Sequence, residues 1–387
     1  MNLIAVKMLV GDRTKYAGIV LGIVFAVLLI TQQTGLFFFF VESSYATVTS
    51  IALPDIWVMD PQVRFIDDRR PMSDTALQRV RGVEGVAWAV PLYKGGIRAR
   101  ISTGKTEDCV LIGIDDATLI GGPATMLQGR LEDLRRSGGV IIDQVTAEDK
   151  LARPGATPGA PKIPLRIGDS LELNDNLAVV VGICKNIPQG QGQAVVITTY
   201  TRALTFSPYE RRLLSYVLVK ARDGLNLDDV CANITRATGL AAYTAEGFKR
   251  ITFTFILQNT PLALIFGFVV ALGVVIGVAI AGQTFYSFTM TNLQYFAMLR
   301  AMGAGTFMLI RLVVLQALVA GGIGYGLGIG VSCLFGAMLA SGGEIELRLT
   351  PQLLIASATA VLFICVGAAL ASIVKVLRLE PAVVFKA

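Results

Sequence analysis

Residues 16–41 read YAGIVLGIVFAVLLITQQTGLFFFFV, a continuous apolar stretch near the start of the chain. Three more apolar stretches follow only after a long mixed segment, and they occupy residues 253–282, 307–339 and 353–374. Each has at least the roughly 20 residues that an α-helix needs to cross the hydrocarbon of a bilayer. The sequence therefore predicts a membrane protein with four transmembrane helices, one and then three, and a large domain between the first and the second.

Lysine and arginine in the short polar segments predict the orientation, because cationic flanks resist translocation. They lie before the first stretch, near the link 283–306 and after the fourth stretch: Lys7, Arg13, Lys15, Arg300, Arg311, Lys375, Arg378 and Lys386. The remaining short loop, 341–350, carries two glutamates and a single arginine. We therefore expect an amphipathic helix at 1–15, the link and the tail 375–387 in the cytoplasm, and residues 42–250 outside it.

Composition argues against several classes of function. The chain is 53% hydrophobic with a formal net charge of +6, and its cations gather at the predicted membrane edges. They are explained by topology and by contact with anionic lipid headgroups, so a nucleic-acid partner is not expected. Histidine is absent, which removes the commonest metal ligand and the commonest general base. We expect no catalytic residue, bound cofactor or metal site in this chain.

Five cysteines are divided between the predicted parts of the protein. Cys109, Cys184 and Cys231 fall in the outer domain, while Cys333 and Cys365 fall in the third and fourth spans. Three outer cysteines cannot all pair within one chain, and none has a C-x-x-C spacing. One disulfide or three buried free thiols both fit the sequence.

The outer domain, 42–250, has the pattern of an α+β fold. Short β-rich runs are found at 97–101, 110–114, 140–142, 177–183, 194–198 and 216–219. Helices are predicted from Ser73 or Asp74 and from Asp228, each with a residue type that caps helix N-termini. A Pro/Gly-rich insert at 153–164 predicts a surface loop, and we place the end of the first of two lobes near it or a little after it.

Small and polar residues inside the spans mark candidate contacts. Gly322, Gly326 and Gly330 recur every four residues in the third span, which favours close helix packing and a dimer interface over a substrate path. Burying an unpaired amide in hydrocarbon is costly, so polar residues in the spans need partners. Four amides fall within or near the outer ends of the first two spans: Gln32, Gln33, Gln258 and Asn259. They either pack between helices or line a cavity that lipid headgroups enter.

The link between the second and third spans reads LQYFAMLRAMGA at 293–304. It resembles the segment E-[FY]-G-x-L-R-A-x-G-A of FtsX/MacB-type permeases, the membrane subunits of type VII ABC transporters. The outer phrases at 113–115, 139–143 and 167–171 and the tail 377–382 also look like that family, and 55–58 (DIWV) is most similar to its DevC group. Tyr295 and Ala297 depart from the family's usual Glu and Gly.

The resemblance implies a non-catalytic permease that forms a homodimer and binds two copies of a separate ATPase subunit, which holds ATP and Mg. The ATPase contact would lie in the link, on Tyr295, Phe296, Met298, Leu299 and Arg300; an inert interfacial helix is the alternative. The spans would pass movement to the outer domain, a process called mechanotransmission. DevC relatives work with a periplasmic adaptor and an outer-membrane channel to export glycolipids or similar amphiphiles. Other possibilities are an FtsX-like platform that activates a periplasmic enzyme, and haem or lipoprotein export without an adaptor.

Overall fold

The computed structural model describes residues 13–51, 53–68, 70–101, 103–155, 161–187, 189, 192–208, 214–341, 347 and 349–377. Most of the expected N-terminal helix 1–15, most of the loop 341–350 and the tail beyond 377 lie outside these residues. The chain divides into two compact units. The helix bundle comprises Met1–Phe39 and Pro261–Ala387, and the sheet domain comprises Phe40–Thr260.

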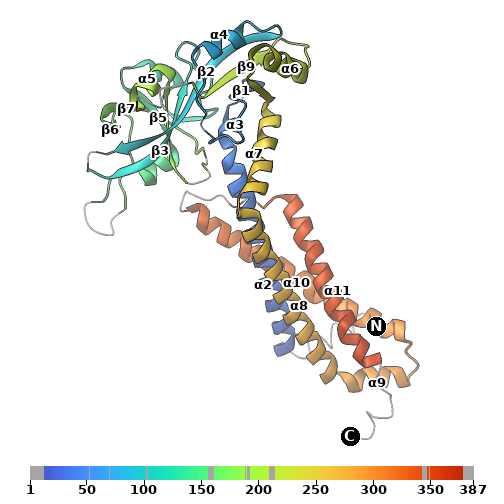
Figure 1. Cartoon of the computed structure of the whole chain (residues 1–387). Coiled ribbons are helices and arrows are strands. Elements are labelled where there is room, and N and C mark those ends of the chain that lie inside the picture. The colour runs from blue at the N-terminus through green and yellow to red at the C-terminus, as the bar shows by residue number, and fades with distance from the viewer. Residues whose placement is uncertain are drawn as a thin grey trace. The chain divides into compact units, whose positions relative to one another are not determined.

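Long helices make up the helix bundle (Figure 1). They are α2 (Arg13–Ser44), α8 (Leu262–Thr291), α9 (Leu293–Ala301), α10 (Thr306–Ser341) and α11 (Pro351–Leu377). All except the short α9 are long and apolar enough to cross a membrane, and the sheet domain lies between the first and second of them in the chain. This confirms the predicted architecture of one and then three apolar helices around an α+β domain.

The second apolar stretch is divided differently from the prediction of one helix over 253–282. Helix α7 (Ala245–Asn259) carries its first residues, and α8 begins only at Leu262. Pro261 lies between them, and its missing N–H and fixed φ suit the start of a helix but not its interior. At its other end α8 continues to Thr291, so it takes up part of the link that was expected from residue 283 onwards.

The bundle packs through a buried apolar core with a few hydroxyl contacts between helices. The hydroxyls of Thr31 in α2 and Ser332 in α10 share a hydrogen bond of 2.7 Å. Those of Thr289 in α8 and Ser372 in α11 share one of 2.6 Å. Both pairs are buried, so they satisfy polar groups that would otherwise be unpaired in an apolar environment.

The sheet domain is built on a sheet of ten strands among the residues that the structure describes. They are β1 (Ile56–Met59), β2 (Val86–Arg100), β3 (Thr106–Ile114), β4 (Met126–Gln128), β5 (Gly139–Asp143), β6 (Ser170–Leu173), β7 (Asn176–Cys184), β8 (Ala194–Thr199), β9 (Tyr216–Ala221) and β10 (Ala241–Thr244). Their order is β10-β1-β9-β2-β3-β8-β5-β7-β4, with β6 paired to β2 and β7. Five of the six predicted β-rich runs fall within strands, and the sixth, 97–101, extends one residue beyond the end of β2.

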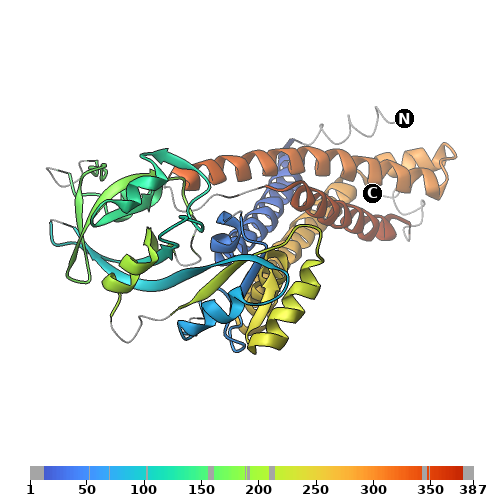
Figure 2. The same ribbon diagram turned by 90° about the horizontal axis from the view of Figure 1, so that it is seen from above.

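The long strand β2 joins the two parts of the sheet (Figure 2). Its first half pairs with β9 as far as Leu92, and its second half pairs with β3 from Tyr93 onwards. The predicted division near 153–164 does not coincide with a division in the strand pairing, because β5 precedes this insert and pairs with β7 and β8, which follow it. The insert is closed at its base by a bridge between Arg153 and Ile163.

Short helical segments accompany the sheet. They are α3 (Ala46–Ser50), α4 (Thr75–Arg81), η1 (Leu131–Arg135), η2 (Thr146–Lys150), α5 (Tyr200–Phe206) and α6 (Leu227–Thr238), followed by α7. Helix α4 begins after Asp74 as expected, whereas the cap of α6 is Asn226, whose side chain accepts a hydrogen bond from the Asp228 N–H at 3.0 Å. Trp57, Tyr216 and Phe248 pack together in the core, with ring centroids 5.7 to 6.0 Å apart.

Candidate functional site

Helix α9 is a short helix with defined ends between two long ones. Asn292 separates it from α8, and its side-chain amide donates to the Phe288 carbonyl at 2.9 Å, which satisfies a carbonyl at the end of α8. Gly303 follows α9 with a φ of +93°, a value that favours glycine. The Gly303 N–H donates to the Arg300 carbonyl at 3.0 Å. The sequence around the link thus forms a separate element rather than an extension of α8 or α10.

The predicted ATPase-contact residues do not all lie on the same side of α9. Tyr295 and Met298 are 55% and 44% exposed, Arg300 is exposed, and Leu299 is half-buried. Phe296 is only 1% exposed and belongs to the core of the bundle. The side chain of Phe296 is already enclosed by the chain's own helices, unlike those of the other predicted contact residues, and its contact with a partner stays a prediction.

Two exposed apolar residues, one in the link and one just after it, were missed by sequence reasoning. Met302 follows α9 directly, and Phe307 lies in the first turn of α10; they are 76% and 79% exposed. Tyr295, Met298 and Met302 follow one another at spacings of three and four residues, which places them on one face of the helix. We call these three residues the α9 face. Met302 could have been found from the sequence by extending this helical spacing by four residues from Met298.

The glycines of α10 fall on two faces with different surroundings. A Cβ atom added at Gly322, Gly326 or Gly330 would meet nothing within 4 Å. One added at Gly324 would lie 2.8 Å from Ile23 of α2, and one at Gly328 would lie 2.7 Å from Val27. The close approach of helices within this chain therefore uses the glycines between those that the sequence singled out. The face of Gly322, Gly326 and Gly330 is open.

The four amide residues are divided between the two units. Gln32 and Gln33 are half-buried in the helix bundle. Gln258 and Asn259 are exposed at the end of α7 in the sheet domain, where the Asn259 amide donates to the Phe255 carbonyl at 3.1 Å. Their assignment as lining of one cavity stays a prediction.

Comparison with known families identifies the chain. Residues 17–237 match the MacB-like periplasmic core domain, and residues 248–381 match the FtsX-like permease C-terminal region. The first match alone covers more than half of the chain. The chain is an FtsX/MacB-type ABC permease. Permeases of this family are membrane subunits of ABC transporters, are generally non-catalytic, dimerise and associate with an ABC ATPase. With its four candidate spans, the protein is an inner-membrane permease.

Three similar solved structures each cover about half of this chain. The extracellular domain of the noncanonic ABC-type transporter YknZ from Gram-positive bacteria has 16% identity and a TM-score of 0.35, covering 50% of this chain and 99% of its own. The periplasmic region of MacB from Actinobacillus actinomycetemcomitans has 13% identity and a TM-score of 0.37, covering 55% and 96%. A domain of a putative permease from Porphyromonas gingivalis has 14% identity and a TM-score of 0.32, covering 50% and 90%. No curated protein matches the chain.

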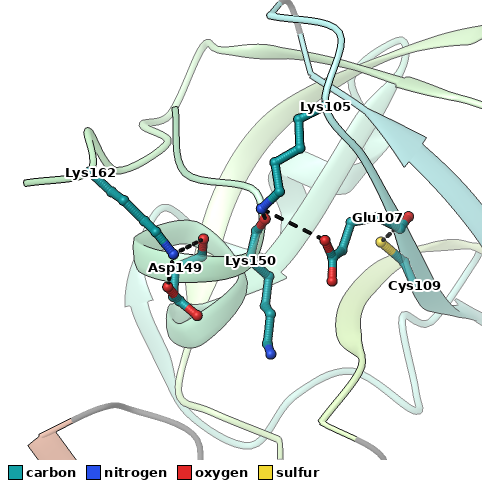
Figure 3. Close-up of polar contacts among 6 residues, drawn as sticks. All are labelled: Lys105, Glu107, Cys109, Asp149, Lys150 and Lys162. Carbon is teal, nitrogen blue, oxygen red and sulfur yellow. Dashed lines mark hydrogen bonds and ion pairs between the residues drawn. The ribbon is translucent and has the colours of Figure 1, made fainter. Parts of the chain in front are cut away.

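A polar groove of about 800 Å³ follows the exposed part of the β2–β3 hairpin in the permease's sheet domain. Arg98 and Asp108 form an ion pair across the hairpin, with Nε and Oδ1 3.5 Å apart, and Arg100 pairs with Glu172 of β6. Next to the groove, the Lys105 ammonium donates to the Lys150 carbonyl and lies 3.7 Å from Glu107 Oε2, so the hairpin turn is tied to η2 (Figure 3). Within the described residues, no group of acidic side chains and cysteines could hold a metal ion.

The thiols of the sheet domain are buried and free in the described structure. Burial raises the pKa of Cys109 to about 12, with Glu107 adding to the effect. Burial and the neighbouring Asp143 raise the pKa of Cys184 to about 12, and burial raises that of Cys231 to about 11. Since the thiolate is the reactive form, these cysteines act as apolar core residues.

Proposed function

We propose that this permease is the membrane subunit of a homodimeric ABC exporter that works by mechanotransmission. The α9 face and Arg300 dock onto an ATPase subunit, two copies of which bind ATP and Mg for the dimer. Both termini and the link face the cytoplasm, and the sheet domain lies outside it, in agreement with the placement of lysine and arginine.

The observation that carries this proposal is the two-sided environment of α9. Tyr295 and Met298 point away from the bundle as large exposed side chains, while Phe296 is enclosed in the core between them. An exposed apolar residue beside a cation suits a protein interface, where aromatic residues, methionine and arginine are enriched. Because Phe296 is packed in the bundle, displacement of α9 by a partner would be transmitted to the helices around it.

The remaining parts of the proposal concern the dimer and the cargo. The open face of Gly322, Gly326 and Gly330 lets a second copy approach closely. We assign glycolipids or other amphiphiles as cargo, with Gln32 and Gln33 near their path and the sheet domain as the platform for a periplasmic adaptor and an outer-membrane channel. The similarity of residues 55–58 to the DevC group supports this assignment.

Affinity purification of the full chain from native membranes tests the ATPase contact. An ABC ATPase should be identified by mass spectrometry in the purified complex. Tyr295→Asp with Met298→Asp should remove it, since each interface hot spot contributes about 2 kcal/mol or more, roughly thirtyfold in affinity. Leu177→Asp is the matched control, because Leu177 is an exposed leucine of the sheet domain. Undiminished recovery of the ATPase with the double variant would contradict the docking site.

Phe296→Ala separates docking from transmission. Its ring is enclosed in the core of the bundle rather than exposed on α9, so the ATPase should still co-purify. Loss of the enclosed ring should, however, alter the ATP hydrolysis rate of the complex, because the movement of α9 is no longer passed to the core. Loss of association with this variant would show instead that Phe296 belongs to the docking surface. Lipids and any adaptor recovered in the same purification would test the proposed cargo.

A further inference from the structure

The loop at residues 60–68 is fixed to the core of the sheet domain. Lys94, in the middle of β2, has a side chain that is 1% exposed and forms an ion pair with Asp67, with Nζ and Oδ1 2.6 Å apart. The Tyr216 hydroxyl donates to the Ile66 carbonyl at 2.6 Å from within the aromatic core. The ammonium end of this ion pair is buried and the Asp67 side chain is 41% exposed, so leaving Lys94 without its partner would be costly, and the contact ties the loop to β2. We call residues 60–68 the anchored loop.

The anchored loop places an aromatic ring and a cation against the last turns of α7. Phe65 stacks on Phe255, with ring centroids 4.6 Å apart and an angle of 8° between the ring planes. The Arg64 guanidinium lies 5.2 Å from the centre of the Phe255 ring, and the Arg64 side chain is 63% exposed. The ring contact orients the guanidinium while leaving most of it available to a ligand.

Two arginines share a single carboxylate at this place. Arg64 Nε lies 3.7 Å from Asp68 Oδ2, and Arg70 Nε lies 3.5 Å from Asp68 Oδ1. Two cations and one anion leave a surplus positive charge. Exposed ion pairs of this kind are weak, so they do not prevent an anion from binding to the same guanidinium groups.

The chain itself brings this cluster close to the membrane surface. Helix α7 ends four residues after Phe255, and the candidate span α8 begins at Leu262. Four helical and three extended residues reach at most about 17 Å. The headgroup layer is about 5 to 7 Å thick on each side, and an arginine side chain extends several ångströms towards it. The chain therefore tethers Phe255, over whose ring the Arg64 guanidinium lies, within about 17 Å of the start of the candidate span α8.

A second cation and ring pair lies where the chain leaves the other span. Tyr45 directly follows the last residue of α2, and the Lys249 ammonium lies 5.2 Å from the centre of its ring. Aromatic rings and cations are enriched at membrane interfaces, because the ring occupies the headgroup level and the cation meets phosphate. The two pairs are independent in sequence, and both occur next to the connection with a span.

We propose that Arg64, Arg70 and the Phe65–Phe255 stack form a binding site for the phosphate of a phospholipid headgroup at the outer surface of the membrane. The anchored loop makes this contact part of the rigid sheet domain. The bound lipid would fix the height of this edge of the domain above the bilayer. The inference requires only that the sheet domain lies outside the membrane, and it holds for any cargo.

The test uses the full chain in vesicles of phosphatidylethanolamine and phosphatidylglycerol that contain a phosphatidylglycerol with a photoactivatable headgroup. After illumination, mass spectrometry should locate adducts on the anchored loop and on the end of α7. Arg64→Gln and Arg70→Gln should each lower the adduct yield about fivefold, the change that corresponds to about 1 kcal/mol per arginine at an anionic surface. Arg236→Gln is the matched control, because Arg236 is an exposed arginine of α6 in the same domain.

Three outcomes would overturn the proposal. They are adducts that avoid both segments, equal yields for Arg64→Gln and the Arg236→Gln control, and loss of the adducts when inorganic phosphate is added, which would indicate a free-anion site. Arg64→Lys keeps the charge and should retain most of the yield, and the fluorescence of the buried Trp57 shows whether each variant is folded. Co-purification of the ATPase should be unchanged in all of them, so a failure here is distinguishable from a failure of the proposed function.

Discussion

Replacing Gly328 of α10 by alanine should destabilise the helix bundle, whereas the same change at Gly326 should not. A Cβ atom at Gly328 would lie 2.7 Å from the Cβ and Cγ1 atoms of Val27 and 3.3 Å from the Val24 carbonyl oxygen. A Cβ atom at Gly326 would meet nothing within 4 Å. The two positions share one helix and one residue type, so they differ mainly in what surrounds them.

The size of the destabilisation by Gly328→Ala depends on whether the neighbouring side chain or helix can move to make room for the added methyl group. Val27 is fully buried and β-branched, so its side chain cannot swing away, and α2 and α10 must separate. Overpacking of this kind costs about 1 to 3 kcal/mol. Separation would also stretch the 2.7 Å hydrogen bond between Thr31 and Ser332, one turn further along both helices, and such bonds contribute about 0.6 kcal/mol in membrane proteins. The sum is about 1.6 to 3.6 kcal/mol for Gly328→Ala.

Thermal unfolding of the full chain in detergent, followed by loss of the monodisperse peak in size-exclusion chromatography, measures the difference. We expect the midpoint of Gly328→Ala to fall by about 3 to 14 °C, using about 2 to 4 °C per kcal/mol for a unit of this size. Gly326→Ala should match the parent or exceed it slightly, because alanine favours the helix over glycine. Equal midpoints for the two variants, or a lower one for Gly326→Ala, would refute the assignment of the two faces.

Two further predictions concern buried groups of the sheet domain. The thiols of Cys109, Cys184 and Cys231 should resist a maleimide at about pH 8 until denaturant is added, because burial and high pKa values keep them protonated. A cysteine introduced by Leu177→Cys should react at once, since Leu177 is exposed. Rapid labelling of the three native thiols in the folded protein would contradict their burial. Burial raises the pKa of Asp143, so above about pH 4 the unfolded chain releases a proton that the folded chain retains, and the free energy of unfolding should fall as pH rises until the raised pKa is passed. Denaturation followed by tryptophan fluorescence should show that the free energy of unfolding of Asp143→Asn lacks this fall with pH. The same pH dependence in the variant and in the parent would exclude Asp143 as its source.

The lengths of the apolar stretches and the β-rich runs could be predicted from sequence because they depend on local composition. Four stretches long enough to cross a bilayer leave few alternatives, and the runs rich in β-branched residues became strands. The division of the outer domain could not be found in this way. The strands β5 and β7 pair across the insert at 153–164, and such pairing depends on contacts between residues that are distant in the chain.

The sequence by itself determined the class of protein and the order of its spans. Tertiary structure decided which side of each span packs against other helices of the same chain. In a helix that is apolar on all sides, periodicity does not distinguish the face that packs inside the chain from the face that meets lipid or a second copy. For this reason the sequence could not show that Gly324 and Gly328 meet α2 while Gly326 stays open, or that Phe296 is enclosed while Tyr295 and Met298 are exposed.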